Sequence, residues 1–389
     1  MDAETKSSDC IKIAALGDIM LDREVGKHYF NKPEDFILED IAEQLRDCDL
    51  VIANLENPVG LNGQPHPKQD PHVAFRCHPD TLQTLKNLQV DVVTLANNHL
   101  LDYGEETLLD TLKHLDNINI KHVGGGKDYE QANKPAIFEI KNKKIALFPS
   151  VMVYSASTEK AKTGKPGVAD YKISKLLSAI KKHKEDGYIV LVTIHWGIEY
   201  CFYPIPYQRR QAQKMIDAGA SVIIGHGPHY PQGVENYKNG QIVHSLGNFI
   251  FDEPYNYAGK SYIYKSDINI AGKVTHNKII PVNIINHLPV LDKKGDDSRT
   301  AYIVNNLHIA YSRKSKKFWR KINSRWFSDI IWRVNTMKSI KFALLPPVSF
   351  YFTIGFENIF KKFNLNNLKW LIKTVSNRLL HYRFKKQGL

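Results

Sequence analysis

The sequence has few cysteines, and we expect neither a secretion signal nor a membrane-spanning helix in it. Its 389 residues include four cysteines with neither close pairing nor zinc-type spacing: Cys10, Cys48, Cys77 and Cys201. Such cysteines are typical of reduced thiols in the cytosol. The polar, acidic residues 1–9 lack the basic and apolar regions of a signal peptide, and no apolar run reaches the length of a transmembrane helix. We therefore expect a cytoplasmic protein.

Basic residues are concentrated near the carboxyl terminus. The formal net charge is +13, yet residues 313–389 hold 18 Lys and Arg against only Asp329 and Glu357, which leaves residues 1–312 with a net charge of −3. A near-neutral main part argues against nucleic-acid binding. We therefore divide the chain into a domain at residues 1–312 and a basic region at residues 313–389.

The basic region also carries apolar residues at helical spacing. They form two stripes, Trp319, Ile322, Trp326, Ile330 and Val334, then Leu365, Leu368, Leu371, Ile372, Val375 and Leu379. Such stripes are usually core, but basic amphipathic helices with Trp also bind anionic membranes. We expect amphipathic helices that dock either on the anionic inner face of the cell membrane or on a partner protein.

Five apolar segments end in residues of the types that bind metals. Residues 11–16, 50–53, 92–96, 188–194 and 221–224 lead into Asp18, Glu56, the pair Asn98 and His99, His195, and the pair His226 and His229. Continuous apolar runs are typical of strands buried on both faces. Because open α/β sheets bind ligands outside the carboxyl ends of their strands, we expect these side chains to meet at one rim.

Each of these residues alone has a simpler explanation. Asp and Asn at strand ends commonly form turns or cap helices, and a single His is more often structural than a ligand. Glu56, His195 and His226 are not favoured caps, however, and the pattern recurs at five strand ends. Carboxylate, amide and imidazole ligands together predict a site for one or two divalent ions, Mn, Zn, Fe or Mg.

Amphipathic helical patterns between the strands indicate an α/β fold. The patterns are Phe36, Ile37, Ile41 and Leu45; Leu82, Leu85 and Leu88; Leu108, Leu109, Leu112 and Leu115; and Ile173, Leu176, Leu177 and Ile180. Later, residues 234–237 and 241–244 flank a turn, and residues 261–271 and 273–282 alternate like antiparallel strands. We therefore expect sheets of mixed direction.

Seven segments together resemble the capsule synthesis protein CapA family, a branch of the metallophosphatase-like superfamily. In order they are GDIML at 17–21, NLENP at 54–58, FR at 75–76, LANNHLLDYG at 95–104, HWGIEY at 195–200, GHGPH at 225–229 and SLGNF at 245–249. The resemblance implies a four-layer α/β/β/α sandwich with mixed sheets. It also implies a role in making or exporting a surface polymer, such as poly-γ-glutamate or capsular polysaccharide.

The resemblance also implies roles for individual residues. Asp18 would bind one metal, Glu56 would bridge two, and His99 would face the leaving group, while Asn98, His195, His226 and His229 complete the ligand set. Met20 stands where the wider superfamily has a His, and Asp22 is the candidate replacement.

Two arginines are candidates for substrate binding. Arg23 follows the Asp18 segment, and Arg76 follows a long loop at residues 60–75 that is rich in Pro, His, Gln and Gly. Either could neutralise an anionic polymer or phosphoester, or be a solvated surface charge. We expect a metal-dependent hydrolase. The alternative is a non-catalytic component of a polymer synthesis and export complex, with the basic region as its contact to a capsule-synthesis partner.

Overall fold

The computed structural model describes residues 10–69, 73–153, 155, 157–170, 172–197, 199, 204, 206–252, 259–295, 300, 301 and 304. The basic region predicted at residues 313–389 and its boundary with the main domain lie outside these residues. Cys10, Cys48 and Cys77 are free thiols, as expected, whereas Cys201 is not among the described residues. Within the described residues, no helix is both long and apolar enough to span a membrane.

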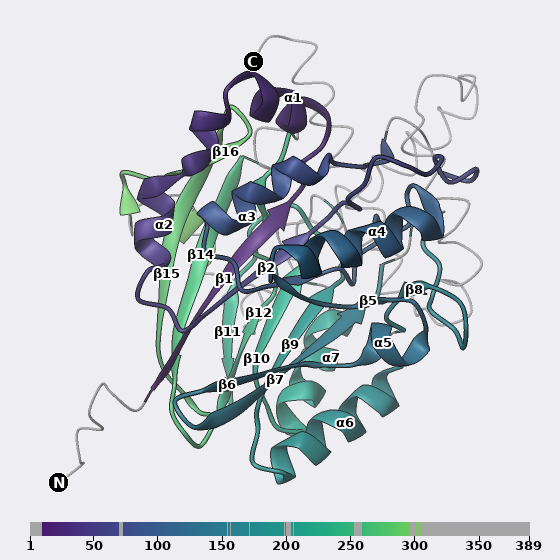
Figure 1. The fold of residues 1–389 in the computed structure, drawn as a ribbon. Coiled ribbons are helices and arrows are strands. Elements are labelled where there is room, and N and C mark those ends of the chain that lie inside the picture. Colours follow the sequence, from purple (N-terminus) through teal and green to yellow (C-terminus); the bar gives the residue numbers. More distant parts are fainter. Residues whose placement is uncertain are drawn as a thin grey trace, which may run out of the picture. The chain divides into compact units, whose positions relative to one another are not determined.

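Two mixed β-sheets form the centre of the described domain (Figure 1). The eight-stranded sheet has the spatial order β16 (Leu288–Leu291), β15 (Val274–Ile285), β14 (Lys260–Ile268), β1 (Ile11–Ile19), β2 (Leu50–Leu55), β3 (Val92–Thr94) and β4 (Lys121–Val123), with β13 (Asn248–Ile250) also paired to β1. The six-stranded sheet has the order β11 (Val234–Tyr237), β12 (Gly240–Val243), β10 (Ala220–His226), β9 (Ile189–His195), β7 (Lys143–Val151) and β6 (Ala136–Ile140). A two-stranded sheet pairs β5 (Gly125–Gly126) with β8 (Gly167–Val168).

Helices cover the outer face of each large sheet, and an apolar core fills the space between the sheets. On the eight-stranded sheet lie α1 (Arg23–Asn31), α2 (Glu39–Leu45), α3 (Gln83–Asn87), α4 (Gly104–Asn117) and the 3₁₀ helices η2 (Pro33–Ile37) and η4 (Pro79–Leu82). On the six-stranded sheet lie α6 (Ile173–Glu185) and α7 (Pro206–Asp217), while the short α5 (Tyr129–Asn133) packs by β5. The predicted four-layer α/β/β/α sandwich with mixed sheets is confirmed.

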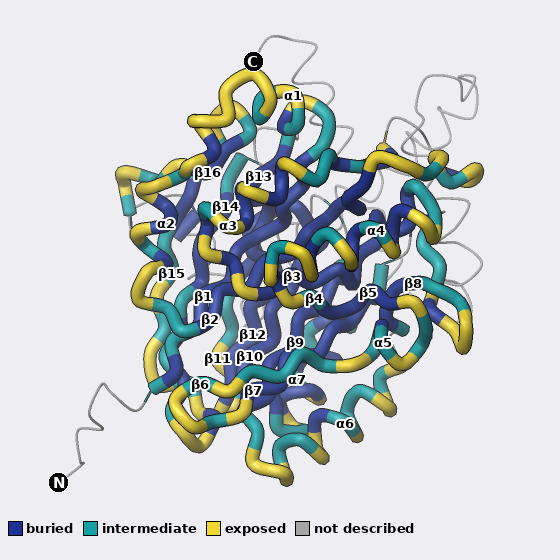
Figure 2. Tube along the Cα trace, in the orientation of Figure 1, coloured by how far each residue is buried: buried dark blue, intermediate teal, exposed yellow. Residues whose placement is uncertain are grey.

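The central strands are buried on both faces, because successive side chains point in opposite directions and a layer covers each face. In β1, Ile13 and Ala15 enter the core between the sheets, whereas Ala14 and Leu16 pack under the helices. Figure 2 shows the central strands of both sheets in the dark blue of buried residues, whereas β6, β11 and β15 are mostly intermediate or exposed. This double burial explains the unbroken apolar runs of the sequence.

The predicted antiparallel pairs form, but one predicted helix is wrong. Strands β11 and β12 pair across a turn, as do β14 and β15. The pattern at residues 36–45 splits into η2 and α2, because Leu38 between them takes a left-handed backbone with φ 53°. Phe36 and Ile41 are therefore buried, while Ile37 is 56% exposed.

Candidate metal centre

Strand register brings the predicted residues to one rim, where the carboxyl ends of the two sheets' parallel strands meet. In the eight-stranded sheet, Asp18 at the end of β1 lies opposite Asn54 of β2 and Asn248 of β13. In the six-stranded sheet, His195 at the end of β9 lies opposite His226 at the end of β10. The apolar strands thus deliver polar side chains from both sheets to one buried place.

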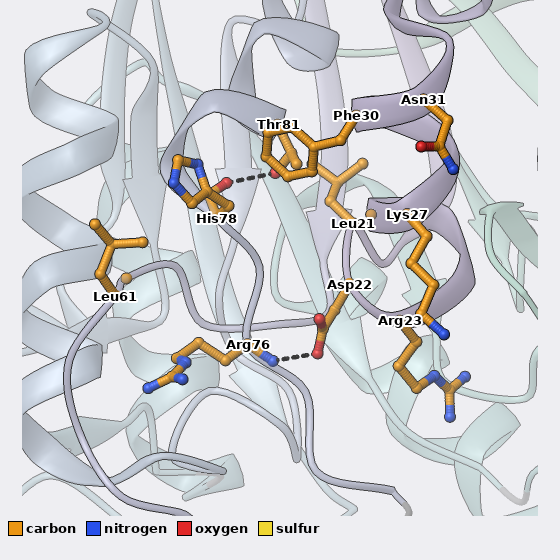
Figure 3. A pocket seen from close by; sticks show the side chains of 12 residues that line it. Leu21, Asp22, Arg23, Lys27, Phe30, Asn31, Leu61, Arg76, His78 and Thr81 are labelled. Atoms are coloured by element: carbon orange, nitrogen blue, oxygen red, sulfur yellow. Dashed lines mark hydrogen bonds between the residues drawn. The ribbon is translucent and has the colours of Figure 1, made fainter.

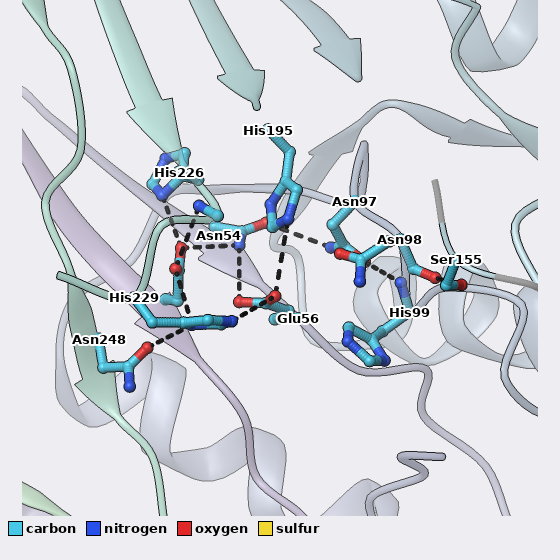
Figure 4. Close-up of polar contacts among 12 residues, drawn as sticks. Asn54, Glu56, Asn97, Asn98, His99, Ser155, His195, His226, His229 and Asn248 are labelled. Carbon is cyan, nitrogen blue, oxygen red and sulfur yellow. Dashed lines mark hydrogen bonds and ion pairs between the residues drawn. The ribbon is translucent and has the colours of Figure 1, made fainter. Parts of the chain in front are cut away.

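Two buried carboxylates, Asp18 and Glu56, lie at this place, and Figure 4 shows Glu56 between His229 and His99. Asp18 and Glu56 are both 0% exposed. Nδ2 of Asn54 lies between them, 2.9 Å from Oδ1 of Asp18 and 3.5 Å from Oε2 of Glu56. The backbone N–H of Gly227 also points to Oδ2 of Asp18, at 3.3 Å. Asp18 has no lysine or arginine within ion-pair distance among the described residues, so nearby imidazoles supply its titratable partners.

Three imidazoles surround the carboxylates. Nδ1 of His226 lies 2.9 Å from Oδ1 of Asp18, and Nε2 of His195 lies 3.7 Å from Oε1 of Glu56. His229 spans the two carboxylates, with Nδ1 3.6 Å from Oδ2 of Asp18 and Nε2 3.8 Å from Oε1 of Glu56. Asp18, Glu56 and His229 each offer a ligand atom within 4.8 Å of the others, which suits a single divalent cation.

Buried polar atoms at this place fit a metal ion. Nε2 of His226, Nδ1 of His195 and Oδ1 of Asn98 are buried and have no hydrogen-bond partner among the described residues. Such atoms are rare in folded proteins because an unmade hydrogen bond is costly. Two buried carboxylates likewise call for a cation. The donor set of carboxylate, imidazole and amide oxygen is one that divalent ions accept.

The electrostatics favour ionised carboxylates beside a neutral imidazole. Burial raises the pKa of the Asp18 carboxyl, but the hydrogen bond and charge of His226, with the charges of His229 and His195, outweigh burial and hold that pKa well below its usual value. Burial lowers the pKa of His195 to about 3, although Asp18 opposes the shift. Ionised carboxylates and neutral imidazoles are the forms that ligate metals.

The loop after β10 depends on unusual backbone conformations. Gly227 has φ 103°, and a Cβ added there would lie 2.8 Å from Nε2 of His195 and 2.8 Å from the backbone oxygen of Trp196. His229 has φ 58°, which is uncommon for a residue with a side chain. This loop therefore holds His226 and His229 against His195 with no room for a larger residue at position 227.

His99 lies on the flank of Glu56 with Asn98, opposite His226 and His229 (Figure 4). Its Nδ1 is 2.6 Å from Oδ2 of the fully buried Asp102, whose carboxylate accepts a hydrogen bond from Nδ1–H. The contact leaves Nε2 as the atom of the ring available to a substrate. Stacking against Phe75, at 4.2 Å between ring centroids, fixes the ring further.

Asp22 and the two predicted arginines have partners away from the carboxylates. Arg23 forms an ion pair with Asp252, and Arg76 donates to the carbonyl oxygens of Asn62 and Gly63 at 2.9 and 3.0 Å. Oδ2 of Asp22 accepts the backbone N–H of Arg76 at 2.6 Å.

Asp22 therefore does not take the place of the missing imidazole. Met20 at that position is buried, and its sulfur lies 3.2 Å from the backbone nitrogen of Asp22.

Sequence reasoning missed several polar residues of the site. They are Asn54, Asn97, Asp102, Asn248 and Asp252. The first four lie inside the motifs at 54–58, 95–104 and 245–249, so their motif membership was the available signal. Asp252 had none, because its partner Arg23 lies 229 residues away in sequence.

Two solved structures that partly superpose on this one are distant from it in sequence. A putative 5'-nucleotidase from Staphylococcus aureus in complex with α-ketoglutarate is 15% identical, covers 77% of this chain and 58% of its own, and has a TM-score of 0.45. A hypothetical protein from Thermus thermophilus is 12% identical, covers 70% of this chain and 98% of its own, and has a TM-score of 0.43.

Curated relatives share a theme in their names. The PGA biosynthesis protein CapA of Bacillus subtilis is 31% identical and covers 84% of each chain. The capsule biosynthesis protein CapA of Bacillus anthracis is 29% identical over 72% of this chain and 69% of its own. A probable polyglutamine synthesis accessory protein of Mycobacterium tuberculosis is 28% identical over 57% and 60%. The bacterial capsule synthesis protein family PGA_cap matches residues 12–253, which include all seven motifs, and this chain belongs to that family.

Proposed function

We propose that this protein is a metal-dependent hydrolase of the phosphoesterase type that acts in the synthesis of a capsule or other surface polymer. The observation that carries the proposal is the buried group of Asp18, Glu56 and His229, with His195 and His226 in contact with its carboxylates. The bond hydrolysed would be a phosphoester or a related anhydride or amide, in an anionic polymer or a phosphoester substrate.

The ligand set is drawn from both sheets. Asp18, Glu56, Asn98, His195, His226 and His229 would hold one or two divalent ions, Mn, Zn, Fe or Mg. A bound ion of this kind supplies a Lewis acid that activates water near neutral pH. The buried position of both carboxylates would keep bulk water away from the charges at the reacting group.

His99 would act as the general acid toward the leaving oxygen. Asp102 accepts a hydrogen bond from Nδ1–H of His99. This contact orients the ring so that Nε2 carries the proton that is transferred. Phe75 packs along the ring and limits its rotation. Asp102 is thus a positioning residue, since it acts through His99 and not on the substrate.

A non-catalytic role in a polymer-export complex is the second candidate, and Met20 favours it. The buried Met20 supplies no imidazole beside Asp18. The compact group of Asp18, Glu56 and His229 provides ligands for one cation and not for two. In that case the rim would bind an ion or polymer without turning it over.

Metal titration of the purified full-length protein tests the proposal. Metal-stripped protein titrated with Mn or Zn should bind one or two ions per chain, and the metal-loaded protein should hydrolyse members of a panel of phosphomonoesters, phosphodiesters, anhydrides and poly-γ-glutamate. Removing one imidazole of a metal site typically lowers affinity by orders of magnitude, so His226→Ala should lose stoichiometric binding.

The exposed His276 on β15 offers a matched control, and His276→Ala should bind as the wild type does. Metal binding without hydrolysis of any member of the panel would favour the non-catalytic candidate. A wild type that binds no ion, or a His226→Ala protein that binds as the wild type does, would show the proposal to be wrong.

A further inference from the structure

An open pocket of ≈ 540 Å³ lies where α1 meets the first residues of the loop at residues 60–75 and the chain segment after that loop. Figure 3 shows its side chains, with Arg23 and Lys27 from α1, Arg76 from the end of the loop, and Phe30 and Leu61 at its rim. None of the six candidate metal ligands lines this pocket. Its chemistry is therefore distinct from that of the carboxylate rim.

Cationic side chains outnumber carboxylates among the residues that line the pocket. Three of the lining side chains are cations, Arg23, Lys27 and Arg76, and one is a carboxylate, Asp22, which accepts the backbone N–H of Arg76 at 2.6 Å. Arg23 and Lys27 also have carboxylate partners outside the lining, Asp252 and Glu24. Arg76 has no carboxylate partner among the described residues; its guanidinium lies 4.2 Å from the centre of the Tyr103 ring. A pocket with such a lining attracts an anionic group.

Lys27 is available to such a ligand. Its amine lies 2.7 Å from Oε1 of Glu24, but the two side chains are 69% and 59% exposed. Exposed ion pairs of this kind contribute little to stability, so an anionic ligand in the pocket would compete well for the Lys27 amine.

The rim of the pocket is apolar. Phe30 is 54% exposed and Leu61 is 60% exposed, and both line the pocket together with the buried Leu21. Large exposed apolar side chains beside cationic side chains are typical of a site that binds an apolar body and an anionic group together.

A stack of three side chains joins the pocket to the candidate metal centre. The rings of Phe75 and His99 stack at 4.2 Å between centroids, and Cζ of Arg23 lies 4.6 Å from the centre of the Phe75 ring. Two groups this close to one ring occupy its opposite faces. Phe75 therefore lies between His99, at the metal centre, and Arg23, in the wall of the pocket.

Arg23 is held in place at a conformational cost. Its φ of 51° is left-handed, a backbone conformation that disfavours a residue with a side chain. The ion pair with Asp252, whose side chain is only 4% exposed, offsets that cost. The chain thus maintains a strained backbone that places this guanidinium against Phe75.

We propose that the pocket binds the part of the substrate that lies on the His99 side of the metal centre, and that this part is an anionic group carried on an apolar chain. Arg23, Lys27 and Arg76 neutralise the anion, and Phe30 and Leu61 cover the chain. The assignment of the pocket to the leaving-group part of the substrate rests on the proposed function, in which His99 faces the leaving group.

Binding of two probes to the full-length protein, measured by calorimetry, tests this inference. Hexyl phosphate carries both features of the ligand and inorganic phosphate carries only the anion. Burying about two methylene groups should make hexyl phosphate bind about tenfold more tightly. Phe30→Ser should weaken hexyl phosphate about fivefold and leave inorganic phosphate unchanged. Lys27→Glu should weaken both probes about fivefold.

Two exposed residues of the same region that do not line the pocket are matched controls. Lys32→Glu and Ile37→Ser should bind both probes as the wild type does. Equal affinity for the two probes would overturn the proposal, and so would equal losses in the control and pocket variants.

His226→Ala separates this inference from the proposed function. That variant should lose the metal but keep its affinity for hexyl phosphate, because His226 does not line the pocket. If hexyl phosphate binding is lost in His226→Ala and unchanged in Lys27→Glu and Phe30→Ser, the probe binds at the metal centre and the pocket proposal fails. If neither the wild type nor any variant binds metal, but Lys27→Glu and Phe30→Ser lose affinity for hexyl phosphate as expected, the pocket proposal holds and the hydrolase proposal fails.

Discussion

Replacing Asp102 by Asn should destabilise the protein far more than its small change in shape suggests. The carboxylate is 0% exposed and accepts four hydrogen bonds. Oδ1 accepts from Nε2 of Gln69 at 2.8 Å and from the hydroxyl of Ser157 at 2.6 Å. Oδ2 accepts from the backbone N–H of Phe75 at 3.0 Å and from Nδ1 of His99 at 2.6 Å. Asp102 thus links His99 to Gln69 and Phe75 in one loop and to Ser157 in another.

The magnitude follows from the number of donors. Asn keeps one oxygen, so two of the four donors would face its NH₂ group and lose their acceptor. Each hydrogen bond to a charged group is worth about 1.5–3 kcal/mol, so the loss is about 3–6 kcal/mol. Removing a buried charge recovers part of this, which leaves a net destabilisation of about 3 kcal/mol. At roughly 2–3 °C per kcal/mol, the melting temperature should fall by about 6–9 °C.

Thermal and urea unfolding of metal-stripped full-length protein would measure this effect without stabilisation from a bound ion. Asp116→Asn is the matched control, because Asp116 also pairs with a histidine, His122 at 3.2 Å, but is 71% exposed. The control should change stability by less than about 0.5 kcal/mol. Equal shifts in the two variants would refute the idea that the Asp102 network stabilises the fold.

Two further substitutions test the packing of the rim and a partly buried ion pair. Gly227→Ala should cost about 2–4 kcal/mol, since its Cβ would meet His195 and Trp196; Gly187→Ala, with φ 84° and no atom within 4 Å, should cost only about 1 kcal/mol in urea unfolding. Burial raises the pKa of Glu235, but hydrogen bonds from His244 and Arg209 outweigh it and lower the pKa to about 2. Because this lies below the value of about 4.3 for an unfolded Glu, the stabilisation is complete above pH 4.3 and is lost as the pH falls toward 2. Burial lowers the pKa of His244, so Arg209 is the cation at neutral pH, and its 35% exposure reduces the effect to about 1–2 kcal/mol. Wild type should therefore lose about half of this amount more stability between pH 5.5 and 3 than Glu235→Gln does, and a slope unchanged by the substitution would contradict this assignment.

The layers of the fold follow from local sequence patterns, whereas the partners within the site do not. A strand buried on both faces leaves an unbroken apolar run, so β1, β2, β9 and β10 were predictable, and their carboxyl ends gave the polar residues of the rim. Strand β7 lacked a polar residue at its end and was missed. The exposure of Ile37 depends on the left-handed turn at Leu38, which no periodicity encodes.

Arg23 shows why contacts between distant residues escape sequence reasoning. A cation just past the Asp18 segment is equally suited to a substrate or to solvent. Its partner Asp252 follows β13, which lies beside β1 through the parallel pairing of Asp18 with Asn248 and of Ile19 with Ile250. That pairing also depends on close backbone approach, because a Cβ on Gly17 would lie 2.2 Å from the oxygen of Gly247. The role of Arg23 therefore became visible only once the sheet was assembled.

The same register bears on the imidazole that Met20 does not supply. Asn248 is brought opposite Asp18, and its Oδ1 lies 2.7 Å from Nδ1 of His229. With Nδ1 donating to Asn248, His229 presents Nε2 toward Glu56, 3.8 Å away. The rim thus gains a residue that orients an imidazole where the resemblance predicted only a loss. The pairing of β13 with β1 thus adds a positioning residue for His229 and leaves the number of candidate ligands at six.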